Sequence, residues 1–381
     1  MSSETEHNNQ NSNPETTSNA FNTIQSGRKL IIILLLPLIF GILIALLSNS
    51  ETTNLSAFRR LFGSSTAARS AAGPLSASAS LAAVTSAAAL KGKTSSIENT
   101  TSFKMKTPIY FLSHGGPSVM YDQDHPAYRK LGQIGREITT KVKPRAVVVF
   151  SAHWQGGKDT IHVNTAETTD LIYDFYGFPD HYYKEKYPNV GSKEVSHRVL
   201  DLLKEAGIDA KGVKRGLDHG VWASFKCAFE PEENPLNVPI VQVSLFDTED
   251  PVQHYRLGEA VSRLREENIL IIVSGMSVHN LRDMRFAFGK PQPLPYTVSF
   301  DEALKEAVTT APEERENAMT ELLKRPDARQ AHPSFDHLLP IHVGAGAAGQ
   351  DLGKRLWTFP EGSMSWAQYR FGEVGNASSS L

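Results

Sequence analysis

The sequence predicts an α/β fold in which a mainly parallel central sheet is flanked by helices. From Thr107 onward, short apolar runs alternate with helical patterns, which is typical of α/β domains. One run, AVVVFSAHW at 146–154, is rich in β-branched residues and indicates a strand buried on both faces, as in parallel sheets. Several of these runs lead into a histidine. Open α/β sheets bind ligands outside the carboxyl ends of their strands, so we expect the functional site there.

Each expected element rests on its own pattern. Two capping boxes, at 299–302 and 310–313, predict the starts of two helices. Apolar runs predict four strands, at 109–112, 147–150, 239–245 and 269–273. Apolar residues spaced three and four apart predict three amphipathic helices, through Ala127, Leu131, Ile134 and Ile138, through Val195, Val199 and Leu202, and through Leu257, Val261 and Leu264.

Composition excludes several classes of function. The formal net charge is −2, and no basic patch is interleaved with aromatic residues, so we expect no nucleic-acid partner. The chain contains one cysteine, Cys227, which rules out an intrachain disulfide and a cysteine-based zinc site. Any bound metal must therefore be held by His, Asp or Glu.

The first hundred residues differ in composition from the rest. We expect a disordered polar leader at 1–29 and a flexible linker rich in Ser, Ala and Thr at 49–104. Between them, the apolar stretch 30–48 is close to the ~20 residues that span a bilayer and is interpreted as a transmembrane signal anchor. A cleaved presequence and a misassigned gene start are the alternatives. A single domain is expected at 105–372 and a flexible tail at 373–381.

This interpretation places the protein on a membrane through 30–48, with the side of the membrane left open. Without that anchor, a cytoplasmic location is expected. The sequence does not indicate an oligomeric state.

Three histidines stand at the ends of expected strands. His114, His153 and His279 follow three of the apolar runs, and a shared sheet edge could bring their imidazoles together around one metal, at ~2.1 Å from each nitrogen. A single histidine is more often structural, so the argument rests on their joint placement. His219 lies in GLDHG at 216–220, where the glycines allow close backbone approach.

Other motifs are weaker or missing. His332 and His337 are five residues apart, a spacing that is a weak metal signal by itself. Asp218 could orient His219, although adjacent residues seldom pair in that way. Neither a phosphate-binding glycine loop nor a serine nucleophile elbow is present, so nucleotide binding and serine-based acyl transfer have little support.

Several motifs, taken in order, resemble the class III extradiol ring-cleavage dioxygenases, and the DOPA 4,5-dioxygenase type in particular. The resemblance covers about 107–371 and does not extend to 1–104. The motifs are SHGGP at 113–117, SAHW at 151–154, YDFYGFP at 173–179, GLDHG at 216–220, VHNL at 278–281, and HP at 332–333 with HLLP at 337–340.

The resemblance implies a catalytic α/β domain with one non-haem metal at the carboxyl ends of its strands. The implied metal ligands are His114, His153 and His279, and His219 is the implied acid-base residue. An imidazole with a pKa near 6.5 could both take and return a catechol proton. Around the substrate, or behind the ligands, we place Trp154, Tyr176, Asn280, His332 and His337.

The implied reaction is cleavage of a DOPA-like catechol by O₂. Fe(II) with open coordination positions is the metal expected for turnover, although three histidines also suit zinc, which has no redox chemistry. Two alternatives remain open at this stage. A zinc-dependent hydrolase would act without consuming O₂. A non-catalytic binding module on the same fold would keep its function after loss of His219.

Overall fold

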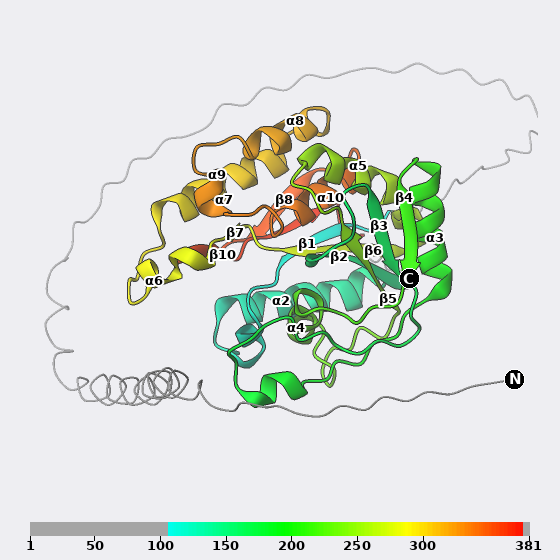
Figure 1. Cartoon of the computed structure of the whole chain (residues 1–381), viewed down its shortest axis with the longest axis horizontal. Helices are drawn as coiled ribbons and strands as arrows, with labels where there is room; N and C mark the ends of the chain where they lie inside the picture. Colours follow the sequence, from blue (N-terminus) through cyan, green and yellow to red (C-terminus); the bar gives the residue numbers. More distant parts are fainter. Residues whose placement is uncertain (1–105, 376–381) are drawn as a thin grey trace, which may run out of the picture. The chain divides into compact units, whose positions relative to one another are not determined.

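The computed structural model describes residues 106–375, in which one large sheet is covered by helices on both faces (Figure 1). The strands are β1 (Ile109–Ser113), β2 (Ala146–Gln155), β3 (Thr160–Asn164), β4 (Asp209–Val213), β5 (Ile240–Leu245), β6 (Ile269–Gly275), β7 (Val278–His279), β8 (Gly353–Trp357), β9 (Pro360–Glu361), β10 (Met364–Ser365) and β11 (Gln368–Phe371). The α-helices are α2 (Pro126–Glu137), α3 (Lys193–Glu205), α4 (His219–Ala228), α5 (Pro251–Val261), α6 (Met284–Ala287), α7 (Pro295–Thr309), α8 (Pro312–Leu322), α9 (Ala328–Ala331) and α10 (Leu339–Ala348). Short 3₁₀ or π turns are η1 (Pro117–Tyr121), η2 (Ile138–Val142), η3 (Asp180–Lys184), η4 (Ser262–Glu267) and η5 (Leu281–Asp283).

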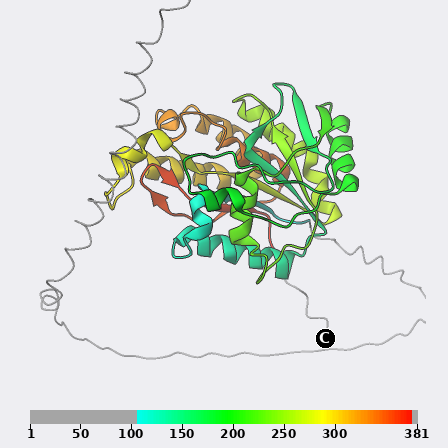
Figure 2. The same cartoon turned by 60° about the horizontal axis from the view of Figure 1, so that its bottom comes forward.

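The predicted α/β fold is confirmed. The large sheet has the strand order β4-β3-β5-β2-β6-β1-β11-β8, and its four central strands, β5, β2, β6 and β1, are all parallel to one another. Figure 2 shows the same domain from a second direction. On one side β3 joins β5 in the antiparallel sense, and on the other β11 joins β1 in the same way. A second, three-stranded sheet has the order β7-β10-β9.

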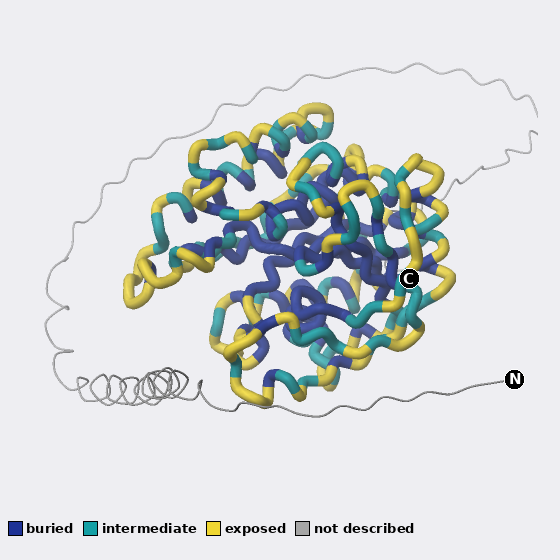
Figure 3. The backbone as a smooth tube through the Cα atoms, in the orientation of Figure 1, coloured by how far each residue is buried: buried dark blue, intermediate teal, exposed yellow. Residues whose placement is uncertain are grey.

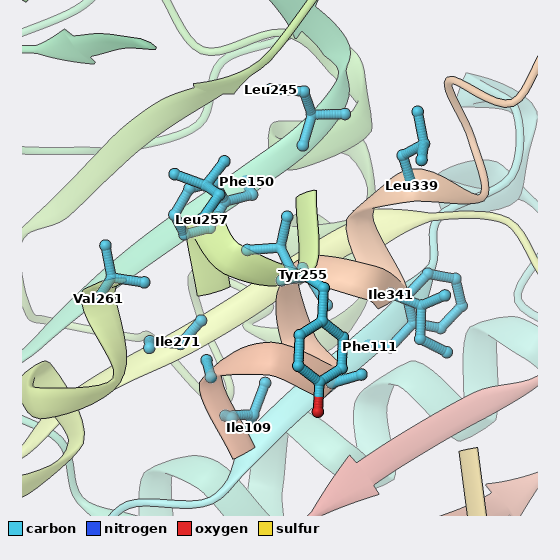
Figure 4. Close-up of a cluster of buried hydrophobic side chains, with 14 of the residues drawn as sticks. Ile109, Phe111, Phe150, Leu245, Tyr255, Leu257, Val261, Ile271, Leu339 and Ile341 are labelled. Carbon is cyan, nitrogen blue, oxygen red and sulfur yellow. The ribbon is translucent and has the colours of Figure 1, made fainter. Parts of the chain in front are cut away.

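Strand β2 is buried on both faces, as its sequence predicts. Val148 and Phe150 belong to the apolar cluster that includes residues of α3, α5, α7 and α10, and Figure 4 shows part of that cluster. Val147 and Val149 belong to the opposite cluster, which includes residues of α2 and α4. Both clusters lie in the buried interior in Figure 3. Because successive side chains alternate between the faces, an uninterrupted apolar run is what a strand between two helical layers requires.

Two details of the predicted elements are corrected. Strand β2 continues to Gln155, so His153 and Trp154 lie within the strand and not beyond it. The capping boxes are both wrong, because prolines at the first helical position start α7 and α8 instead. Ser299 is therefore inside α7, and its hydroxyl donates to Asp327. The hydroxyl of Thr310 donates back to the carbonyl of Glu306.

The expected transmembrane helix also requires correction. No helix within residues 106–375 is long and apolar enough to cross a membrane. The stretch 30–48, to which that expectation applied, lies outside the described residues, as do the leader 1–29, the linker 49–104 and the tail from 376 onward.

Candidate metal centre and active site

Three imidazoles converge at the end of the central sheet. His114 directly follows β1, His153 is near the end of β2, and His337 lies in the turn before α10. The Nε2 atom of His153 is 3.2 Å from Nε2 of His114 and 3.2 Å from Nε2 of His337. One nitrogen from each of the three rings lies within 4.8 Å of the others.

The other nitrogen of each ring is held by a hydrogen-bond partner. His153 Nδ1 is 3.0 Å from Asp174 Oδ2, and His337 Nδ1 is 2.6 Å from Asp336 Oδ2. His114 Nδ1 is 2.9 Å from Ser274 Oγ, which gives its own proton to the carbonyl of Gly220. An ionised carboxylate, or a hydroxyl whose proton is engaged elsewhere, can only accept here. The partners therefore place a proton on each Nδ1 and a lone pair on each Nε2.

This arrangement fits a metal ion. Three lone pairs that converge at 3.2 Å repel one another unless a cation lies between them. Imidazole nitrogens bound at ~2.1 Å to one tetrahedral or octahedral metal are about 3.0 to 3.4 Å apart, so little movement is needed. The carboxylate behind a metal-binding histidine is also a common feature of such sites.

His279, an expected ligand, lies next to this group. Its ring stacks on that of His337, with the centroids 3.7 Å apart and the planes 9° from parallel. His279 is in the short strand β7, which the small sheet holds against β10. His337 and His279 thus lie side by side, and either could supply a third nitrogen.

His219 is adjacent to the metal-binding group. It is the first residue of α4, and its ring centroid is 4.1 Å from that of His153. Its Nδ1 is 2.8 Å from Asp174 Oδ1, and that same oxygen accepts the backbone N–H of His219 at 3.0 Å. His219 lines the cavity described below, so Nε2 is the nitrogen left for a substrate.

Electrostatics favour neutral rings at three of the imidazoles and ionised carboxylates. Burial, together with the neighbouring imidazoles, holds the pKa of His114 well below its usual range. Burial likewise lowers the pKa values of His279 and His337. Burial alone would also lower the pKa of His153, but its hydrogen bond to Asp174 and the charges of the nearby carboxylates raise it. Burial alone would raise the pKa of Asp174, but hydrogen bonds from His153 and His219 hold it far below its ordinary value. Neutral imidazoles are the form that binds a metal.

A cavity of about 620 Å³ opens in front of these groups. Carboxylates of Asp122, Asp174 and Glu361 are part of its wall, while no Lys or Arg of the described residues lines it. Glu361 accepts hydrogen bonds from His125 and Trp366, and both lower the pKa of its carboxyl group, that from His125 more strongly. The apolar and aromatic part of the lining consists of Pro117, Val119, Phe175, Tyr176, Phe178, Leu281, Met284, Met364 and Trp366.

Of the residues expected around the substrate, Tyr176 and His337 line this cavity, and 92% of Tyr176 is exposed. Trp154, Asn280 and His332 are not among the lining residues. The Trp154 ring stacks under the guanidinium of Arg215, outside the cavity. Asn280 accepts the backbone N–H groups of residues 282 and 283, and His332 Nε2 is 3.0 Å from the carbonyl of Ser277. Both therefore support the segment that carries His279.

The position after His219 has no room for a side chain, which explains the glycine there. A Cβ at Gly220 would lie 2.7 Å from His153 Cδ2, 2.8 Å from Ser151 Oγ and 3.2 Å from His114 Cε1. The sequence indicated that this glycine allows close approach, and the groups that approach it are the imidazoles themselves. Any larger residue would displace at least one of them.

Sequence reasoning missed the partners of the imidazoles. Asp174 was hidden inside the aromatic motif 173–179, and Asp336 is adjacent to His337. Ser274 lies near the end of β6 and was not singled out by any motif. The one available signal was the position of polar residues next to expected strand ends, which does not by itself reveal a partner distant in sequence.

Comparisons with known proteins show which family the chain belongs to. Residues 108–372 match the family described as the catalytic LigB subunit of aromatic ring-opening dioxygenase. A 4,5-DOPA dioxygenase extradiol from Beta vulgaris is 36% identical over 270 residues, which cover 69% of this chain and 95% of the relative. A 4,5-DOPA dioxygenase extradiol-like protein from Schizosaccharomyces pombe is 34% identical, covering 65% of this chain and 86% of the relative. The crystal structure of an uncharacterized protein from Escherichia coli K12 has a TM-score of 0.57 and 28% identity, covering 70% of this chain and 100% of the other.

The fold and the comparisons define an α/β enzyme, and its histidine cluster could hold a metal. The chain belongs to the LigB family and is a class III extradiol ring-cleavage dioxygenase of the DOPA 4,5-dioxygenase type. It therefore uses a metal to act on a small aromatic substrate and O₂. The zinc hydrolase and the non-catalytic binding module, which the sequence left open, are set aside.

Proposed function

We propose that this protein cleaves the ring of a DOPA-like catechol with O₂ at Fe(II) held by three histidines. The observation that carries the proposal is the convergence of the Nε2 atoms of His114, His153 and His337, with the ring of His279 stacked on that of His337. Bound Fe(II) would supply a redox-active centre with open positions for both catechol oxygens and for O₂. The same nitrogens suit zinc, which has no redox chemistry, so zinc in a purified sample would not identify the metal of turnover.

We assign His114, His153 and His279 as the ligands. The first two are supported by their facing Nε2 atoms, and the third by the family resemblance and by its place beside the cluster. The alternative third ligand is His337, whose Nε2 lies 3.2 Å from Nε2 of His153. The two rings are stacked 3.7 Å apart, so a small shift could exchange one nitrogen for the other.

His219 is the proposed acid-base residue. Binding of the catechol through both oxygens releases a proton, and a base must hold it until the ring is cleaved. Asp174 occupies Nδ1 of His219, so the proton would be taken and returned at Nε2, on the cavity side. Phe175 packs against His219 with ring centroids 5.5 Å apart and helps to shield this nitrogen from water.

The charges of the cavity favour a substrate that carries a cationic group. Asp122 and Glu361 are part of the wall, and no described Lys or Arg is available to pair with a substrate carboxylate. The ammonium group of DOPA or of a related catechol amine would be attracted to these carboxylates. A catechol whose ring bears only a carboxylate would be repelled, because like charges in a shared site are unfavourable.

The test is oxygen uptake by the full chain after anaerobic reconstitution with Fe(II). L-DOPA, dopamine, catechol and 3,4-dihydroxybenzoate would be compared, with zinc-loaded protein as the control. We expect one O₂ consumed per catechol, a new visible absorbance from the ring-opened product, and the highest kcat/KM for the two amines. Absence of O₂ uptake with every catechol would contradict the proposal.

Metal content after dialysis assigns the ligands. His114→Ala, His153→Ala and His279→Ala should each lose most of the metal, because two imidazoles hold a divalent ion weakly. His337→Ala should keep it. If His337→Ala loses the metal while His279→Ala retains it, the third ligand is His337.

A further inference from the structure

One carboxylate, that of Asp174, contacts two imidazoles that have different proposed roles. Its Oδ2 lies 3.0 Å from Nδ1 of His153. Its Oδ1 lies 2.8 Å from Nδ1 of His219 and 3.0 Å from the backbone nitrogen of the same residue. Since His219 begins α4, Asp174 also satisfies an N–H group that a helix leaves without an internal partner.

We propose that Asp174 is a positioning residue that sets the proton location on both the metal-binding His153 and the acid-base His219. This inference rests on the proposed function for the roles of the two histidines. A carboxylate can only accept, so both Nδ1 atoms must donate and both Nε2 atoms must present lone pairs. In His153 that lone pair faces His114 and His337, and in His219 it is available to the cavity.

Asp174 is held in place before any ligand binds. The segment that precedes it is joined to the one that precedes α4, through a bridge between Leu171 and Leu217 and a hydrogen bond from Ile172 N to the carbonyl of Leu217 at 2.7 Å. The indole of Trp222 donates to the carbonyl of Ile172 at 3.0 Å. These contacts position the carboxylate relative to α4, independently of its hydrogen bonds to the imidazoles.

The other two orienting groups are each used by one imidazole. Ser274 faces His114, and Asp336 faces His337. Among the residues that the structure describes, Asp174 is therefore the group whose loss should affect metal affinity and proton transfer together. That pairing of effects distinguishes its role from a purely structural one.

A second interpretation of the same atoms must be separated from this one. His153, Asp174 and His219 each offer a ligand atom within 4.8 Å of the others, and two histidines with a carboxylate are a known metal-binding combination. A metal there would require His153 to bind through both nitrogens, with neither carrying a proton. If Asp174 accepts hydrogen bonds from the two histidines, each chain binds one metal. If Asp174 is itself a metal ligand, each chain binds two.

The decisive variant is Asp174→Asn. The side-chain oxygen of the new amide would stay hydrogen-bonded to the backbone N–H and the Nδ1–H of His219. The opposite orientation would place the NH₂ group, a donor, against these two donors. The NH₂ group would then face Nδ1 of His153, which must become the acceptor and move its proton to Nε2. That tautomer has no lone pair for the metal, so zinc affinity should fall ~10 to 100-fold, the usual effect of losing such a partner.

Zinc affinity of the full chain is measured by competition with a chelator, and it does not depend on dioxygenase activity. The matched control is Asp170→Asn, an exposed carboxylate in the same segment, which should bind zinc as the wild type does. Asp174→Glu keeps an acceptor and should recover most of the affinity that Asp174→Asn loses. Circular dichroism verifies that each variant is folded.

Turnover at saturating Fe(II) tests the second half of the role. Asp174→Ala frees both imidazoles, so kcat should stay at least ~10-fold low even at full metal occupancy, because His219 is no longer held for proton transfer. Wild-type zinc affinity in Asp174→Asn would overturn the proposal, and so would a stoichiometry of two metals in the wild type that falls to one in Asp174→Ala. A wild type that binds one zinc but cleaves no catechol would contradict the proposed function alone.

Discussion

The chemistry of each histidine depends on which of its nitrogens carries the proton. His114, His153 and His337 are alike as residues, and Ser274, Asp174 and Asp336 occupy their Nδ1 atoms, which leaves Nε2 of each ring to face the cluster. His332 shows the contrast, since its Nε2 is directed at a backbone carbonyl 3.0 Å away and is not available to a metal. The partner, and not the ring, decides the role.

Removal of His219 should separate proton transfer from metal binding. His219→Ala leaves the imidazoles of His114, His153 and His279 in place, so the protein should keep its metal and still bind catechol without oxygen. Turnover should fall by ~10² to 10⁴, the usual contribution of a positioned acid or base. Metal analysis and steady-state oxygen uptake measure the two effects. The control is His197→Ala, an exposed histidine on α3, and loss of metal from His219→Ala would make His219 a ligand.

A methyl group at Gly220 should displace the imidazole of His153. The Cβ of Gly220→Ala would lie 2.7 Å from the ring of His153, closer than carbon atoms pack. We expect a loss of ~1 to 3 kcal/mol in the free energy of unfolding and weaker zinc binding, because overpacking displaces the ring. The control is Gly132→Ala in α2, where the nearest atoms are at 3.5 Å and the better helix propensity should add up to about 1 kcal/mol. Equal behaviour of both variants in denaturant titration would contradict this account.

The sequence predicted three of the histidines that the structure places around the cavity, His114, His153 and His279, because a strand end is visible as the end of an apolar run. His219 was predicted from its flanking glycines and from the family resemblance. The sequence placed His337 around the substrate and ranked it as a weak metal signal, since a spacing of five has no meaning outside a regular element. Asp174 could not be identified at all. Its two imidazole partners belong to β2 and α4, and only the packing of those elements brings them to one carboxylate.

The same limit applies to the secondary-structure elements. The central strands were predicted because they are buried on both faces and their apolar runs are uninterrupted. Strand β4 is largely exposed at the sheet edge, and its sequence, DAKGV, has no apolar run. The short strands β9 and β10 depend on pairing within the small sheet, which leaves little trace in local sequence. Elements stabilised by their own burial are visible in the sequence, and those stabilised by partners are not.

Helix α10 makes stability depend on pH. All its residues are buried, and His342 Nε2 lies 3.1 Å from the carbonyl of Met319 in α8. Burial, with a smaller effect from His254, lowers the pKa of His342 to about 4. Below the ordinary histidine pKa near 6.5, the unfolded chain takes up a proton here that the folded chain refuses. Stability is therefore fully present above that value and falls as the pH is lowered toward 4.

Replacement of His342 by glutamine tests whether this histidine makes stability fall as the pH is lowered. The amide of His342→Gln can still donate to Met319 but does not titrate. Between pH 7 and 5 the variant should lose less stability than the wild type, by roughly 2 kcal/mol, at about 1.4 kcal/mol per pH unit below 6.5. Guanidinium titrations with chelator present exclude the contribution of metal release. His197→Gln on α3 is the exposed control, and a wild-type pH slope in His342→Gln would refute the assignment.

At the scale of the whole molecule, the site depends on strands contributed by both ends of the domain. β1 delivers His114, and it lies in the sheet between β6 and the C-terminal strand β11. Gln368 in β11 accepts the backbone N–H of Ser113 and donates to its carbonyl, both at 3.1 Å. This pair of hydrogen bonds fixes the residue directly before His114. Tyr369 and Phe371 of the same strand are completely buried.

A chain of residues 105–381 should therefore fold and function without the first 104 residues. It contains the whole family match, 108–372, and every residue assigned to the cavity. A chain of residues 105–366 is the matched comparison, because it keeps all the imidazoles but lacks β11. Loss of β11 exposes the edge of β1 and removes two buried aromatic side chains. Each is worth ~3 to 5 kcal/mol in a core, so together they approach the total stability of a typical domain.

We expect cooperative unfolding, one bound metal and wild-type turnover from 105–381, and an unfolded, metal-free product from 105–366. If 105–381 binds metal but does not turn over, residues before 105 contribute to catalysis. If 105–366 retains the metal, the position of His114 does not depend on β11.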